Sequence, residues 1–119
     1  MLLDHAKDFN KDIILPFTTD LEETYRAAYG ESLLEKLPEV IWNKKGVASV
    51  TRYRYHDHVT ERFVQAYCDN IGHWCQKNGI AMTGHMMEEQ SLSSQTGAIG
   101  EAMRAYRNFT IPGVDILCN

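Results

Sequence analysis

The amino-acid sequence predicts an α/β fold from the order of its segments and from its composition. A long helical pattern ends at Asn78-Gly79, a short apolar segment over residues 80–84 follows, and a polar loop comes next. A helix, a glycine stop, a short buried strand and a loop in that order are typical of an α/β unit. The 119 residues are 44% hydrophobic and 24% charged, an ordinary globular mixture with enough apolar residues for one core. We therefore expect residues 1–119 to form a single segment.

Signals for a first helix begin after Leu15-Pro16, because the residue before a proline favours an extended backbone. Thr19 and Asp20 are N-cap candidates, and each has a glutamate three residues later, as in a capping box. The helix itself is indicated by an apolar stripe at helical spacing, formed by Leu21, Tyr25 and Ala28.

The next segments are short and interrupted by helix breakers. Gly30 is expected to end the first helix, and a second helix over residues 32–37 is expected to stop before Pro38. Residues 43–46, Asn-Lys-Lys-Gly, form a turn signal. Residues 47–55 fit either a short strand or a loop, and we favour the loop.

The strongest helix is predicted over residues 57–78, where Asn78-Gly79 supplies the stop. Its large apolar residues recur at intervals of four, four, four and three, which predicts one core-facing stripe. The members of this stripe are Val59, Phe63, Tyr67, Ile71 and Trp74.

A last helix is predicted over residues 91–108, followed by a strand over residues 114–117. Gly97 and Gly100 would allow close packing of this helix at a small cost in helix propensity. Its expected buried stripe consists of Leu92, Ile99, Met103 and Tyr106.

Reactive side chains are densest in the loop over residues 83–91, just past the predicted strand. His85, Glu88 and Glu89 could supply a general acid, a general base or ligands for a hard cation. Adjacent residues of an extended chain point to opposite sides, so only one glutamate is expected to face the site. Glutamates before a helix also suit the positive end of its dipole, and this capping role is an alternative.

Two further groups of residues contain side chains that can bind ligands. His56-Asp57-His58 lacks partners at a recognised metal-binding spacing, and Asp57 as the N-cap of the long helix explains the segment more simply. Arg52 and Arg54 alternate and could bind a carboxylate or a phosphate, although a solvated loop is the favoured explanation.

Charge and hydropathy exclude several classes of protein. With 12 Lys and Arg against 16 Asp and Glu, the net charge of −4 disfavours nucleic-acid binding. No apolar run approaches the roughly 18 residues of a membrane span, and the acidic start is unlike a secretory signal. Cys68 and Cys75, seven residues apart on a helix, are too distant for a disulfide. We expect a cytoplasmic chain with free thiols and no membrane partner, while export of a longer parent protein stays open.

Several segments together resemble a known family. The most specific are Thr83-Gly84-His85 followed by Glu89, and Ile111-Pro112-Gly113-Val114-Asp115. The similarity continues, over nearly the whole chain, through residues 15–20, Tyr29-Gly30-Glu31, Leu37-Pro38, residues 52–55, Trp74-Cys75 and Asn78-Gly79. This pattern resembles the α-L-rhamnosidase-like group of bacterial glycoside hydrolases, whose catalytic module is a (β/α)₈ barrel.

The resemblance implies a fold and a set of site residues. Glu89 would be an active-site carboxylate, and His85 would contact sugar hydroxyls or orient that carboxylate. Thr83 and Asp115 would be substrate-binding residues, and Asp115, near the end of the next strand, is a weaker candidate than Glu89 and His85. Glu88 stands where the family has an aliphatic residue, which leaves open whether Glu88 or Glu89 is the catalytic group that faces inward.

A (β/α)₈ barrel takes roughly 250 residues. We therefore expect a partial barrel, with about two strands and three to five helices. Glycosidic cleavage uses two carboxyl groups. A fragment that holds only one of them would be a glycoside hydrolase with little activity alone.

The alternative is a non-catalytic helical module that oligomerises or binds sugar. In both cases we expect a carbohydrate ligand and homo-oligomers, with strand edges or the stripe of Phe63, Tyr67, Ile71 and Trp74 buried between copies. No redox cofactor or metal is expected, although a calcium ion is an alternative because carboxylate-rich sugar sites often recruit one.

Overall fold

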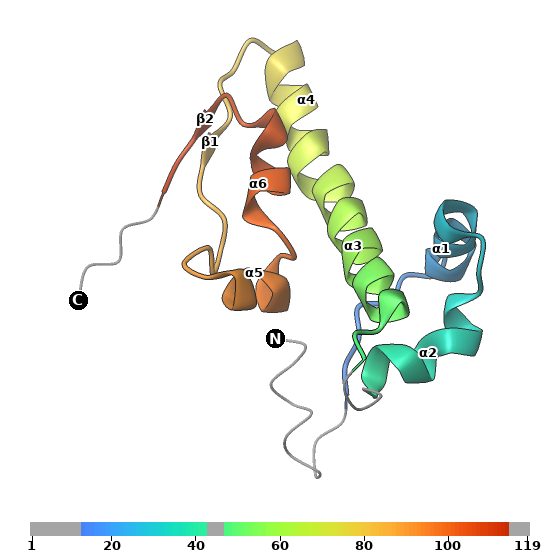
Figure 1. Cartoon of the computed structure of the whole chain (residues 1–119). Coiled ribbons are helices and arrows are strands. Elements are labelled where there is room, and N and C mark those ends of the chain that lie inside the picture. The colour runs from blue at the N-terminus through green and yellow to red at the C-terminus, as the bar shows by residue number, and fades with distance from the viewer. Residues whose placement is uncertain (1–12, 43–46, 115–119) are drawn as a thin grey trace. The chain divides into compact units, whose positions relative to one another are not determined.

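The computed structural model describes residues 13–42 and 47–114, and the contacts within it divide the chain into two compact units (Figure 1). The first unit ends at Val59 and the second begins at Thr60. Of the predicted strand over residues 114–117, only Val114 lies within the described residues, so Asp115 is outside them. The predicted turn over residues 43–46 is also outside them.

Helix α1, Leu21–Tyr29, forms where its apolar stripe predicts it. Leu21 and Tyr25 are buried, and the chain leaves the helix through Gly30, whose φ of 72° is left-handed. The Gly30 N–H donates to the carbonyl of Arg26 at 2.8 Å, which closes the last turn.

Helix α2, Leu33–Ile41, runs through Pro38, so the prediction that it stops before the proline is wrong. The Ser32 hydroxyl caps its start by accepting the N–H of Glu35. Pro38 has no N–H, so α2 lacks the backbone hydrogen bond that this residue would donate to the preceding turn. The helix nevertheless continues for one more turn, in which Val40 is buried. Burial on both sides of Pro38, by Leu33 and Val40, offsets the lost hydrogen bond.

Helix α3, Val50–Val64, begins seven residues earlier than predicted, so the expectation of a loop over residues 47–55 is wrong from Val50 onward. Ser49 caps it, because the Ser49 hydroxyl accepts the N–H of Arg52 at 3.1 Å. Tyr55 is fully buried in the core of the first unit, and its hydroxyl donates to the carbonyl of Pro16 at 2.7 Å. The other buried members of this core are Leu21, Tyr25, Leu33 and Val40.

The predicted long helix exists, as α3, a π-helical turn η2, Gln65–Asp69, and α4, Asn70–Lys77. It ends at Asn78-Gly79 as predicted, but the predicted buried face is wrong. Four large members of the stripe are at least one third exposed: Phe63, Tyr67, Ile71 and Trp74. Small residues occupy the buried face instead, and they are Val64, Cys68, Gly72 and Cys75.

Close backbone packing explains this choice of face. A Cβ on Gly72 would lie 2.7 Å from the Cβ of Asn108, so only glycine permits this approach. The π-helical turn also breaks the regular helical repeat between α3 and α4, which a spacing count along the sequence does not include. Cys68 and Cys75 are free thiols, in agreement with their spacing.

The second unit contains two short strands, β1, Thr83–Gly84, and β2, Ile111–Pro112, which pair in parallel (Figure 1). The partners are Thr83 with Ile111 and Gly84 with Pro112. The expected strand after the last helix therefore starts at Ile111, before the predicted residues 114–117. A helix-rich chain with a parallel strand pair agrees with the predicted α/β class.

The segment between the two strands is divided into α5, Leu92–Ala98, α6, Ala102–Ala105, and the 3₁₀ turn η3, Tyr106–Asn108. The prediction of one helix over residues 91–108 is wrong because the backbone turns at Gly100, where φ is 86°. A Cβ there would lie 1.9 Å from the Thr60 hydroxyl oxygen. Of the predicted stripe, Leu92 and Met103 are exposed, Ile99 is buried and Tyr106 is half-buried.

The core of the second unit consists mostly of small and medium-sized side chains. Its buried members are Val64, Cys68, Met86, Ile99, Ala102 and Ala105, with Tyr106 and Phe109 packed against them. Among the described residues, no helix combines the length and the apolar character needed to cross a membrane.

Candidate functional site

The loop between β1 and α5 holds Glu89 against Tyr106. The Tyr106 hydroxyl donates to the Glu89 carboxylate oxygen Oε2, and the same hydroxyl accepts the backbone N–H of Met86 at 2.8 Å. Glu89 is half-buried. The carboxylate is thus fixed in the loop that follows β1, where the sequence predicts the densest group of reactive side chains.

Tyr106 is itself fixed by packing. Its ring meets the Phe109 ring edge to face, with the centroids 5.1 Å apart. Burial of the hydroxyl, and secondly its hydrogen bond to Glu89, raise the pKa of Tyr106 above its usual value. The hydroxyl therefore stays protonated at neutral pH and remains a donor to the carboxylate.

The two adjacent glutamates have different surroundings. Glu88 is exposed and adopts a left-handed φ of 60°, while Glu89 is half-buried. Backbone contacts fix both residues: the Ser94 hydroxyl donates to the carbonyl of Glu88, and the Gln95 amide donates to that of Glu89, each at 2.9 Å. The helix cap of α5 is Ser91, in a capping box with Ser94, so the glutamates do not occupy the N-cap position.

The other predicted site residues are exposed or lie outside the described chain. His85 is exposed. Thr83 is exposed and its hydroxyl donates to the carbonyl of Ile111 at 2.8 Å, so it joins β1 to β2. Asp115 lies outside the described residues. Glu89 is the predicted residue whose carboxylate the fold holds in a half-buried place.

Tyr106 was not predicted as a site residue, since its position in an apolar stripe indicated packing alone. The available signal was chemical. A tyrosine on a buried helix face needs a partner for its hydroxyl, and the nearby loop is rich in carboxylates.

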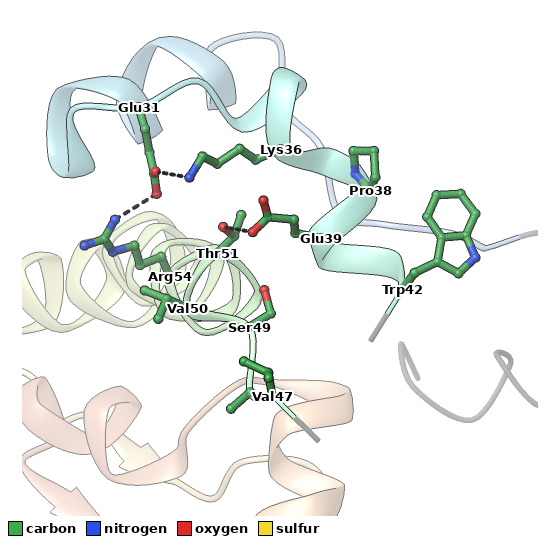
Figure 2. Close-up of a pocket in the computed structure, with 11 residues that line it drawn as sticks. Glu31, Lys36, Pro38, Glu39, Trp42, Val47, Ser49, Val50, Thr51 and Arg54 are labelled. Atoms are coloured by element: carbon green, nitrogen blue, oxygen red, sulfur yellow. Dashed lines mark hydrogen bonds and ion pairs between the residues drawn. The ribbon is translucent and has the colours of Figure 1, made fainter. Parts of the chain in front are cut away.

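A pocket of about 420 Å³ lies in the first unit, between α2 and the start of α3 (Figure 2). Glu31 pairs with both Lys36 and Arg54, each at 2.8 Å, and the Thr51 hydroxyl donates to Glu39 at 2.9 Å. Hydrogen bonds from Lys36 and then from Arg54 lower the pKa of Glu31. The other lining residues are Pro38, Trp42, Val47, Ala48, Ser49 and Val50.

The two arginines singled out in the sequence are in a helix, so neither lies in a solvated loop. Arg52 donates from Nε to the carbonyl of Val40 at 2.7 Å. Arg54 binds Glu31 and lies over the Tyr29 ring, 5.4 Å from its centroid.

The histidine motif is likewise in the interior of α3. Because α3 begins at Val50, Asp57 lies inside the helix, and the prediction that it caps the helix is wrong. Its carboxylate accepts a hydrogen bond from the Tyr29 hydroxyl at 2.8 Å. His58 pairs through Nε2 with the Thr24 hydroxyl at 3.0 Å. Within residues 13–42 and 47–114, no group of three or more His, Cys, Asp or Glu side chains could hold a metal ion.

Comparisons of the chain with protein-family models, with curated proteins and with solved structures found no match.

Proposed function

We propose that this chain is part of a glycoside hydrolase, in which Glu89 supplies one of the two carboxyl groups that act on the glycosidic bond. One observation carries the proposal: the half-buried Glu89 carboxylate is held by the Tyr106 hydroxyl just past the carboxyl end of a parallel strand. In parallel α/β folds and barrels, this end of the strands is where active sites are built.

The hydrogen bond to Glu89 favours one of the two carboxylate roles. A donor directed at a carboxylate stabilises its ionised form. An ionised carboxylate suits the nucleophile or the general base, whereas the general acid must carry a proton. In this proposal Glu89 is the nucleophile or base, Tyr106 is a positioning residue, and the acid belongs to a part of the barrel other than β1 and β2.

The proposed fold is a segment of a (β/α)₈ barrel, in which β1 and β2 are neighbouring strands and α5 and α6 belong to the connection between them. Two parallel strands, with helices in their connection, support this reading. The resemblance to the α-L-rhamnosidase-like group points to a carbohydrate substrate and to no redox cofactor. With one of two carboxyl groups, the isolated chain should hydrolyse aryl glycosides slowly or not at all.

The second candidate is a non-catalytic module that self-associates. It is favoured by the exposed faces of Phe63, Tyr67, Ile71 and Trp74, of which the first two stack with centroids 5.7 Å apart. Analytical ultracentrifugation at micromolar concentration tests it. A dimer that dissociates in Tyr67→Glu supports self-association, and a monomer at all concentrations contradicts it.

A binding experiment tests the role of Glu89 without requiring turnover. Protonated iminosugars resemble the oxocarbenium-like transition state and bind to an ionised catalytic carboxylate. We expect calorimetry to detect iminosugar binding to the natural chain, with a loss of about tenfold or more in Glu89→Gln. The matched control is Glu88→Gln, which changes only the exposed neighbour and should bind as the natural chain does. Equal losses in both variants, or no binding at all, would contradict the proposal.

A further inference from the structure

We propose that the pocket between α2 and α3 is a second carbohydrate site, which binds a neutral sugar ring without acting on it. The inference rests on the proposed function for its ligand class. Its structural basis is independent, because every lining residue belongs to the first unit.

The pocket has the size and composition of a small-molecule site. Its volume of about 420 Å³ falls within the roughly 300–1,000 Å³ of typical ligand pockets. One part of the lining is apolar and consists of Pro38, Trp42, Val47, Ala48 and Val50. The remainder is polar, and such a two-sided lining suits a ligand with one apolar face and a polar rim.

The charges of the lining favour a neutral ligand. Lys36 and Arg54 are cationic, Glu31 and Glu39 are anionic, and the formal charges cancel. Glu31 is paired with both cations at 2.8 Å, so a phosphate or carboxylate would have to compete with its carboxylate for them. A neutral ligand avoids that cost.

The polar groups offer donors and acceptors side by side, as a polyhydroxylated ring requires. A carboxylate has about four lone-pair sites, and the Thr51 hydroxyl uses one of those on Glu39. Lys36 and Arg54 have further N–H donors beyond those that bind Glu31. Figure 2 shows these side chains converging from α2 and α3 on the space between the two helices. Adjacent hydroxyls of a sugar can donate to a carboxylate and accept from a cation.

Trp42 supplies the apolar platform. It follows directly after α2 and is 66% exposed, so a large aromatic surface is open at the edge of the pocket. The C–H face of a pyranose covers such a surface and leaves the hydroxyls at the ring edge free for hydrogen bonds. Covering Trp42 removes apolar area from water, which stabilises the complex.

The chain contains two tryptophans, and this permits a matched fluorescence experiment. Trp74 is 58% exposed, lies on α4 in the second unit and does not line the pocket. The variant Trp74→Phe reports Trp42 alone, and Trp42→Phe reports Trp74 alone. Each is titrated with methyl α-L-rhamnoside, methyl β-D-glucoside and inorganic phosphate.

We expect at least one methyl glycoside to change the emission of Trp42 saturably, with no change at Trp74 and none with phosphate. In calorimetry, Trp42→Leu and Glu39→Gln should each weaken binding of that glycoside by about tenfold. Three results would overturn the proposal: no response to either glycoside, a response from Trp74, or a stronger response to phosphate. Iminosugar binding that depends on Glu89 tests the proposed function separately, so either proposal can fail while the other stands.

Discussion

The two units of the molecule are stabilised by different kinds of packing. The first buries large side chains, with Tyr25, Leu33 and Tyr55 completely inaccessible. The second buries small ones such as Cys68, Ala102 and Ala105, and it brings backbones close together at Gly72 and Gly100. The stability of a core of large residues depends on the apolar area that each side chain removes from water. The stability of a core of small residues depends on close packing, which any added atom would disrupt.

This difference predicts opposite sensitivities. The first unit should suffer most from truncation of large side chains, and the second from the addition of a single methyl group. The site proposals follow the same division, since the pocket lies beside the aromatic core and Glu89 is held beside the close-packed one.

The largest expected effect is that of Gly100→Ala in the second unit. The new Cβ would lie 1.9 Å from the Thr60 hydroxyl oxygen, and alanine also disfavours the φ of 86°. We expect the free energy of unfolding to fall by about 4 kcal/mol, the sum of overpacking and a left-handed backbone. The matched control is Gly30→Ala, with a φ of 72° but no heavy atom within 4 Å of the new Cβ. Urea unfolding should show a loss of only about 1 kcal/mol there, and equal losses would contradict the packing account.

Truncation of Leu33 is the corresponding test in the first unit. Leu33 is fully buried and its neighbour Leu34 is 54% exposed on the same helix. Leu33→Ala should lower the free energy of unfolding by about 3 kcal/mol, and Leu34→Ala by less than about 1 kcal/mol. Urea unfolding monitored by circular dichroism measures both. Similar values for the two leucines would mean that the core of the first unit is placed wrongly.

A smaller effect is expected for Tyr106→Phe, which keeps the ring and removes the hydroxyl. The Met86 N–H and the Glu89 carboxylate both lose a partner, and we expect a destabilisation of about 1 kcal/mol. Iminosugar affinity should fall as well, because Glu89 is no longer positioned. Tyr53→Phe, at a tyrosine that is 70% exposed, is the control and should change neither quantity. Full affinity in Tyr106→Phe would remove the positioning role.

The smallest expected effect is the dependence of stability on acid. In the second unit, hydrogen bonds from Arg107 lower the pKa of Glu61 and of Asp69. In the first unit, hydrogen bonds lower the pKa of Glu22 to about 2, and the largest contribution comes from Arg26. A carboxyl with a depressed pKa stabilises the fold above its unfolded value near 4, and this contribution disappears as the pH falls toward 2. Because these carboxylates are only partly buried, solvent screens the effect.

The comparison of the two units can be made with single substitutions at low pH. Arg107→Gln should reduce the acid-induced loss of stability that arises in the second unit. Arg26→Gln should reduce the corresponding loss in the first unit. Urea midpoints measured between pH 5 and pH 2 give the difference for each variant. An unchanged pH profile in both would show that these ion pairs do not contribute.

Local signals in the sequence predicted the position of α1 and its end at Gly30, because these depend on neighbouring residues alone. Of the predicted stripe, Leu21 and Tyr25 are buried, whereas Ala28 is exposed. The long helix was predicted to exist, but its buried face was not. That face is decided by how closely Gly72 meets Asn108, 36 residues later in the chain, and by the π-helical turn at Gln65–Asp69. The helical start of α3 was missed because residues 50–55 have no strong apolar period, although Tyr55 is buried.

The site was predictable in the same limited way. The polar loop follows the glycine stop as predicted, but the expected short buried strand over residues 80–84 is wrong, because only Thr83–Gly84 is a strand and Ile80 is 52% exposed. The role of Tyr106 depends on a contact across 17 residues, and the pocket depends on the packing of α2 against α3. Spacing rules within one helix or strand contain no information about either contact.

The most direct test of the central claim follows the carboxyl carbons of Glu88 and Glu89 by ¹³C NMR during an iminosugar titration of the full chain. If Glu89 meets a carbohydrate at the end of β1, its carboxyl resonance moves saturably and furthest, while that of Glu88 stays nearly constant. A chain in which both resonances remain fixed, or in which Glu88 alone responds, would contradict a role for Glu89 in glycoside chemistry.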